Sequence, residues 1–104
     1  MIQFQTSGEQ LICIPQQEII ASNVPTMREE LIDYLDRETA WNELVFNCQQ
    51  VETLDSIGIN LIVGLFKRAR VAEKSFKVSG CNPAIVKVLQ LFRLDEQFTV
   101  EGQA

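Results

Sequence analysis

The alternation of apolar and polar residues near the N-terminus predicts two short strands. Residues 2–5 alternate strictly, residues 6–9 (Thr-Ser-Gly-Glu) are typical of a turn, and residues 10–14 are rich in β-branched side chains. This pattern indicates an antiparallel β-hairpin. The hairpin is expected to end at Pro15, because proline cannot donate a hydrogen bond within a sheet.

The period changes at Val24, where apolar residues begin to recur every three or four positions along one face of a predicted helix. Charged residues fall mostly on the opposite face. Pro25 suits the first turn of this helix, since an N–H has no partner within the helix there. The start of the helix has three alternatives: a cap at Ser22, a cap at Asn23, or a capping box of Thr26 and Glu29.

Two further helices are predicted, one from Ser56 and one after Asn82. The second helix carries positive residues in its last turns, where they suit the negative end of the helix dipole. We interpret them as a solvated helix end; they are Lys67, Arg68, Arg70 and Lys74. The third helix begins with Asn82 as its cap and Pro83 at its first position. Its core face is expected to comprise Ile85, Val88, Leu89 and Phe92.

Strand-like segments at residues 43–48, 76–79 and 98–100 separate these helices. The order β-β-α-β-α-β-α-β predicts parallel pairing with right-handed crossovers in the second half of the chain. Because the first two strands are antiparallel, we expect an α/β fold with a mixed sheet. The chain shows no repeat or linker, so residues 1–104 are expected to form a single domain.

The composition narrows the classes of function. The chain has 14 acidic and nine basic residues, a formal net charge of −5, and no histidine. An acidic balance disfavours nucleic acid as a partner, because phosphate binding requires positive charge. The lack of histidine removes the usual general base and the commonest metal ligand. We therefore expect neither an enzyme nor a metal site, and no bound cofactor.

Three cysteines, Cys13, Cys48 and Cys81, lie more than thirty residues apart without a CxxC pair. This sparse, odd number favours reduced thiols in the cytoplasm. Cys81 is the best candidate for a reactive thiol because it precedes a helix start, although packing as a small apolar residue is its more ordinary role. The N-terminus lacks a signal-peptide pattern, and the longest apolar stretch, residues 57–66, is too short to span a bilayer, so no membrane insertion is expected.

Residues 54–59 (Leu-Asp-Ser-Ile-Gly-Ile) carry the most informative chemistry. Asp55 and Ser56 can both cap the second helix, and a helix cap is the simplest interpretation of the motif. Gly58 is unfavourable in a first helical turn, which indicates close packing or access for another molecule. A second interpretation is a switch, since a phosphate on Ser56 would bring negative charge to the positive end of the helix.

The order of these motifs resembles the STAS domain of bacterial anti-sigma factor antagonists. In that family the second helix opens with Asp-Ser-Ser/Ala-Gly followed by an apolar residue, as residues 55–59 do here with isoleucine in the third place. Residues 25–31 (PTMREEL) are similar to the family's first helix, and residues 82–100 to its third helix and last strand. The resemblance covers nearly the whole chain. It implies a STAS-like α/β domain with helices mainly on one face of a mixed sheet.

The resemblance also implies a function in partner switching. The unphosphorylated protein would bind an anti-sigma factor serine kinase and thereby release a sigma factor. Phosphorylation of Ser56 by that kinase would end the complex, and a phosphatase acting on phospho-Ser56 would restore it; the ATP belongs to the kinase. By position, the resemblance implies partner-binding residues at Asp55, Ile57, Gly58, Asn60, Ser22 and Asn23.

Three positions depart from the family pattern. Alignment on Pro25 places Gln17 and Ile20 where relatives carry glycine and aspartate, and Ile57 replaces a small residue. A second hypothesis is therefore a STAS-type accessory subunit of a membrane transport complex, which binds a transporter ATPase without phosphorylation. A third hypothesis, from a different class, is a thiol-dependent redox protein that uses Cys81.

Overall fold

The computed structural model describes residues 1–103, whose centre is a five-stranded sheet with the strand order β1-β2-β3-β4-β5. The strands are β1 (Ile2–Ser7), β2 (Gln10–Pro15), β3 (Glu43–Asn47), β4 (Ser75–Cys81) and β5 (Thr99–Gly102). β1 pairs with β2 in antiparallel fashion, whereas the pairs β2–β3, β3–β4 and β4–β5 are parallel. The predicted mixed sheet is confirmed.

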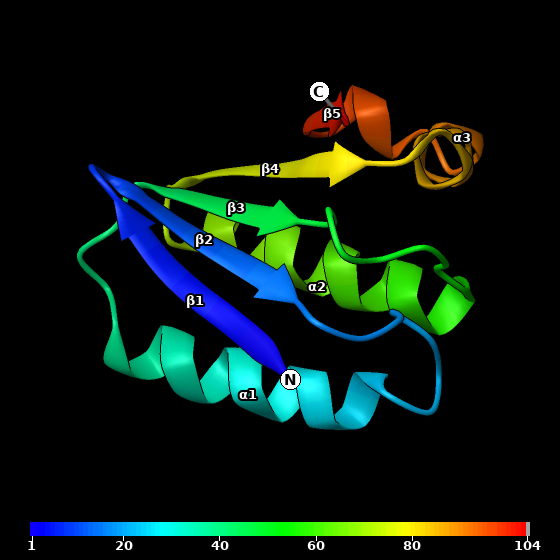
Figure 1. Ribbon diagram of the computed structural model, residues 1–104. Coiled ribbons are helices and arrows are strands. Elements are labelled where there is room, and N and C mark those ends of the chain that lie inside the picture. The colour runs from blue at the N-terminus through cyan, green and yellow to red at the C-terminus, as the bar shows by residue number, and fades with distance from the viewer. Residues whose placement is uncertain (104) are drawn as a thin grey trace.

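Three α-helices connect the parallel strands: α1 (Val24–Arg37), α2 (Ser56–Val71) and α3 (Pro83–Leu91). A short 3₁₀ helix, η1 (Leu94–Glu96), precedes β5. Figure 1 shows α1 and α2 side by side against one face of the sheet, with α3 beyond the carboxyl end of β4. The expectation that the helices lie mainly on one face is confirmed.

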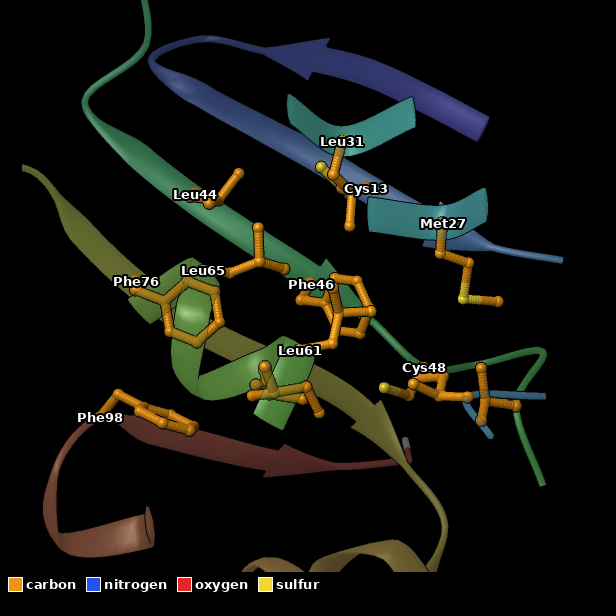
Figure 2. Packing of buried hydrophobic residues seen from close by; sticks show 14 of the residues in the cluster. Cys13, Met27, Leu31, Leu44, Phe46, Cys48, Leu61, Leu65, Phe76 and Phe98 are labelled. Atoms are coloured by element: carbon orange, nitrogen blue, oxygen red, sulfur yellow. The ribbon is translucent and has the colours of Figure 1, made fainter. Parts of the chain in front are cut away.

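The hydrophobic core fills the space between the sheet and the pair α1 and α2, as Figure 2 shows. Alternate residues of the strands point toward these helices because successive side chains of a strand face opposite sides. The strand side of the core includes Leu11, Cys13, Leu44, Phe46 and Val78, and the helix side includes Met27, Leu31, Leu61, Ile62 and Leu65. Burial of this apolar surface is the main force that fixes the two helices on the sheet.

The start of α1 lies where the Asn23 alternative places it, but without the side-chain cap that was expected there. Asn23 is the residue that precedes the helix, but its side chain does not cap it. The Asn23 amide nitrogen instead donates a hydrogen bond to the carbonyl oxygen of Glu18, at 2.9 Å. Asn23 thus stabilises the loop before α1 rather than the helix itself.

The start of α3 is as predicted, but its end is not. The Asn82 side chain accepts a hydrogen bond from the backbone N–H of Ile85 at 2.8 Å, and Pro83 opens the helix. The expectation that Phe92 joins the core is wrong: the helix ends at Leu91, and the Phe92 side chain is 56% exposed. Arg93 adopts a left-handed conformation with φ of 57°, which turns the chain toward β5.

The fourth strand is longer than the sequence indicated, since it continues through Gly80 to Cys81. Gly80 has φ of 66°, and the pairing with β5 shifts register between Val78 and Cys81. Glycine tolerates this left-handed conformation and therefore permits a bulge within the strand instead of ending it. After the bulge the chain reaches Asn82, at the edge of the sheet where the parallel strands end.

Candidate functional site

Three connecting segments meet where the parallel strands end. They are residues 16–23 between β2 and α1, residues 48–55 between β3 and α2, and Asn82 between β4 and α3. Parallel strands present their carboxyl ends at one edge of a sheet, so the segments that follow them lie together. Figure 1 shows these connections at the end of the molecule toward which the arrows of β2, β3 and β4 point.

The Asp55 carboxylate joins two of these segments. One oxygen accepts a hydrogen bond from the backbone N–H of Gly58 at 2.8 Å and so caps α2. The other accepts one from the backbone N–H of Ala21, also at 2.8 Å, in the loop before α1. These N–H groups, that of Gly58 first, lower the pKa of the Asp55 carboxyl because they stabilise its charged form.

Ser56 is the first residue of α2, and its side chain is exposed. The N-terminal turn of a helix presents unpaired N–H groups and a partial positive charge, so it tolerates an added anion. The Ser56 hydroxyl at this place is accessible from the solvent. The sequence has no histidine to activate this hydroxyl, and the two oxygens of the neighbouring Asp55 carboxylate accept hydrogen bonds from backbone N–H groups.

Gly58 is required by close packing. A Cβ atom at this position would clash with the backbone carbonyl oxygen of Ile19 and would lie 2.6 Å from Cδ1 of Leu54. Gly58 is itself buried. Of the two explanations that the sequence left open, close packing thus accounts for this glycine, which lets the first turn of α2 approach the loop before α1.

Glu18 is a site residue that the sequence reasoning missed. Its carboxylate oxygen Oε1 accepts hydrogen bonds from the backbone N–H groups of Glu52 and Thr53, at 2.8 and 2.7 Å, and from the Thr53 hydroxyl at 3.2 Å. Partial burial raises the pKa of the Glu18 carboxyl, but these hydrogen bonds outweigh that effect and the pKa is lowered. No local pattern marks Glu18, because its partners lie 34 and 35 residues further along the chain.

Backbone hydrogen bonds complete the link between the segments. The N–H of Ile19 donates to the carbonyl of Thr53 at 3.3 Å, and the N–H of Asp55 donates to the carbonyl of Ile19 at 3.2 Å. The Asn82 amide adds the third segment by donating to the carbonyl of Glu52 at 3.2 Å. The three segments are therefore bonded into one unit that holds Ser56 in place.

The six residues expected to bind a partner fall into two groups. Ser22, Ile57 and Asn60 are exposed, and the Ile57 side chain is 41% exposed. Gly58 is buried, while Asp55 and Asn23 are half-buried and bonded to the protein's own backbone. The first group thus lies on the protein surface, and the second group stabilises the loops through packing and hydrogen bonds.

The three cysteines lie inside the protein. Cys13 and Cys48 are fully buried and Cys81 is 1% exposed. Burial raises the pKa of the Cys13 thiol to about 12. The neighbouring Cys81 thiol, together with burial, raises the pKa of the Cys48 thiol, whereas the neighbouring Cys48 lowers the pKa of Cys81. Because a reagent has no access to Cys81 in the folded state, the structure favours its packing role.

None of the helices in residues 1–103 combines the length and the apolar character that a membrane crossing requires.

Solved structures with this fold include several bacterial regulators. A candidate anti-sigma factor antagonist from Thermotoga maritima is similar with a TM-score of 0.89 at 20% identity, over 98% of this chain and 86% of that one. An anti-sigma factor antagonist from Mycobacterium paratuberculosis gives 0.84 at 19% identity, over 97% and 84%. The phosphorylated Bacillus cell fate determinant SpoIIAA gives 0.71 at 17% identity, over 96% and 90%. The family model of the STAS domain matches residues 1–103, and the chain therefore belongs to the STAS domain family.

Proposed function

We propose that this protein is an anti-sigma factor antagonist whose binding to an anti-sigma factor serine kinase is switched off by phosphorylation of Ser56. The observation that carries the proposal is the exposed Ser56 side chain at the first position of α2, beside a cap and two loops that are bonded to each other. The similar folds of anti-sigma factor antagonists support it.

The switch acts through charge on a preformed surface. A phosphoserine carries roughly −1.5 to −2 charges at neutral pH, so the formal charge would fall from −5 to about −7. The N-terminus of α2 tolerates this anion, whereas the half-buried Asp55 carboxylate beside it adds like charge. The main effect of phosphorylation is therefore on the partner that covers Ser56, and the domain itself stays folded.

The partner surface is formed by the exposed residues around Ser56. Ser22, Ile57 and Asn60 contact the kinase, while Asp55, Gly58 and Asn23 act by holding the loops. The ATP is bound by the kinase, and a phosphatase returns phospho-Ser56 to serine. This cycle takes place in the cytoplasm, where reduced thiols such as those of this chain are ordinary.

The test is incubation with the anti-sigma factor kinase of the same organism and Mg-ATP, followed by intact-mass and peptide mass spectrometry. We expect one phosphate, on Ser56, and none on Ser56→Ala. Ser56→Glu should weaken the kinase complex, whereas Ser7→Glu, an equal charge change at the exposed end of β1, should leave it unchanged. Absence of phosphate on Ser56, together with no binding of the unmodified protein, would contradict the proposal.

A second function is favoured by one observation, the 41% exposure of Ile57 where the family carries a small residue. An exposed apolar side chain beside Ser56 suits a constant contact that phosphorylation does not regulate. The protein would then be an accessory subunit of a membrane transport complex and would bind its ATPase. Co-purification of the unmodified protein with such an ATPase, lost in Ile57→Ala, is the outcome expected for this function and not for the first.

A further inference from the structure

An open groove runs between α1 and α2 and begins one helical turn beyond Ser56. It has two halves, with volumes of about 160 and about 640 Å³, which share Gly64 and Arg68 of α2. The half nearer Ser56 includes Asn60 in its lining, and the other half includes Trp41. Along α2, from Asn60 to the end of the helix, the groove extends for roughly 16 Å at a rise of 1.5 Å per residue.

The floor of the groove is apolar. It consists of core side chains from both helices, namely Leu31, Leu35, Leu61 and Leu65, which are almost fully buried. Ile32 and Val71 border the groove and are 41% and 85% exposed. A Cβ atom on Gly64 would meet nothing within 4 Å, so this glycine leaves a gap through which another backbone can approach α2.

The rim of the groove is positively charged, in contrast to the protein as a whole. Four of the nine basic residues line it, and the acidic residue among its lining is Asp36; the four are Arg28, Lys67, Arg68 and Lys74. Asp36 forms an ion pair with Arg68 across the two helices. Among residues 1–103, no carboxylate pairs with Lys67 or Lys74. Of the four positive residues interpreted as a solvated helix end, Lys67, Arg68 and Lys74 thus line a groove. The expectation that Lys74 belongs to the last turns of α2 is wrong, because the helix ends at Val71.

We propose that the groove between α1 and α2 is a docking surface for an acidic amphipathic helix of a partner protein. An apolar floor between two helices takes the apolar face of a third helix. Carboxylates on the flanks of that helix would contact Arg28, Lys67 and Lys74, and one of them would compete with Asp36 for Arg68. Both halves are open to solvent, which suits a helix better than an acyl chain, because small-molecule sites enclose most of their ligand.

This surface is distinct from the Ser56 hydroxyl and does not depend on phosphorylation. The helix in the groove would bind the Ser56 and phospho-Ser56 forms with nearly equal affinity. A phosphate on Ser56 would lie beyond the end of the groove and would repel the acidic helix only weakly. A partner that covers both surfaces would have one contact that the phosphate controls and one that it does not.

The test uses a fluorescein-labelled peptide of about 16 residues, with leucine at every third or fourth position and glutamate beside the leucines. We expect it to bind the full chain at low salt at least about tenfold more tightly than the same peptide with lysine for glutamate, with affinity falling as salt is added. In ¹⁵N–¹H spectra the shifted amides should belong to α1 and α2. Trp41, the single tryptophan, should change its fluorescence.

Two substitutions in the groove should weaken binding of the acidic peptide, and a third should strengthen it. Gly64→Leu fills open space and should weaken binding at least about tenfold while the fold is kept. Arg68→Gln should weaken binding about threefold, and Asp36→Asn, which frees Arg68, should strengthen it by a similar factor. Lys87→Gln on α3, outside the groove, is the matched charge control and should change nothing.

Four outcomes would overturn the proposal. The first is equal affinity for the acidic and basic peptides, and the second is full binding by a correctly folded Gly64→Leu. The third is the absence of peptide binding, combined with binding of decanoate or of vesicles of anionic phospholipid. That binding would be detected as shifts of the amide signals of α1 and α2. Self-association of the protein through this face, detected by sedimentation, would count against it in the same way.

Discussion

The carboxylate of Asp55 accepts a hydrogen bond from the backbone N–H of Ala21, at 2.8 Å, across 34 residues of sequence. Because the same carboxylate caps α2 at Gly58, one side chain sets both the start of the helix and its distance from the loop before α1. The aspartate of the motif therefore has a structural task that is separate from any contact with a partner.

Removal of this carboxylate should loosen the site without unfolding the domain. In Asp55→Ala we expect faster amide hydrogen exchange at Ala21 and Gly58, since both N–H groups lose their acceptor. Asp33→Ala, which removes an exposed ion pair with Arg37 on α1, is the matched control. Unchanged exchange at Ala21 in Asp55→Ala would show that the link between the loops does not need the carboxylate.

Acid should destabilise the protein through two carboxylates at the site. The pKa values of Asp55 and Glu18 are lowered in the folded state, so the unfolded chain binds protons more readily. Their contribution to stability is present above the ordinary carboxyl pKa of about 4 and is lost as the pH falls through the lower folded values.

Urea unfolding of Glu18→Gln measures this effect. Relative to wild type, the variant should be less stable at about pH 7, and the difference should shrink toward about pH 3. Glu29→Gln, an exposed change on α1 without these backbone hydrogen bonds, is the control and should follow wild type throughout. A constant difference between Glu18→Gln and wild type across this range would contradict the assignment.

Two glycines of the same helix should respond to alanine in opposite ways. Gly58→Ala places a methyl group against Ile19 and Leu54 and should lower the free energy of unfolding by about 1–3 kcal/mol. Gly64→Ala adds the methyl group to open space and should raise it by about 0.5–1 kcal/mol, because alanine costs less entropy in a helix. Urea denaturation measures the free energy of unfolding of both variants. A stabilised Gly58→Ala would disprove the close contact of Gly58 with Ile19 and Leu54.

Asn82→Ala should weaken the start of α3 and its link to the β3–α2 loop. Loss of the cap on Ile85 typically costs about 1 kcal/mol, and the hydrogen bond to the carbonyl of Glu52 is lost with it. Asn60→Ala, at an exposed position inside α2, should stay within about 0.5 kcal/mol of wild type. Thermal and urea unfolding measure the stability of both variants. Equal stabilities would show that Asn82 does not stabilise the loops of the site.

The elements that could be predicted from the sequence are those with local signals. The hairpin has a turn between an alternating segment and one rich in β-branched residues, and α3 has Asn82 and Pro83 at its start. The end of α3 escaped prediction because Phe92 continues the helical spacing, while the left-handed turn at Arg93 leaves it exposed. The continuation of β4 escaped because Gly80 permits a bulge as readily as a turn.

The site was predictable in its motif but not in its framework. Asp55 and Ser56 were recognisable from adjacent residues, and so was the unusual position of Gly58. Glu18 was not, because its hydrogen bonds join segments that only the folded sheet brings together. The groove between α1 and α2 was likewise hidden, since its charges come from two helices.

Because the three cysteines are buried, their reactivity in the unmodified protein measures local opening of the sheet. Cys13 belongs to β2, Cys48 follows β3, and Cys81 ends β4. Since their side chains are at most 1% exposed, an alkylating reagent can reach each of them only while its part of the sheet is open. The rate at which each cysteine is alkylated in native buffer would therefore report the opening of its own strand, without any engineered label.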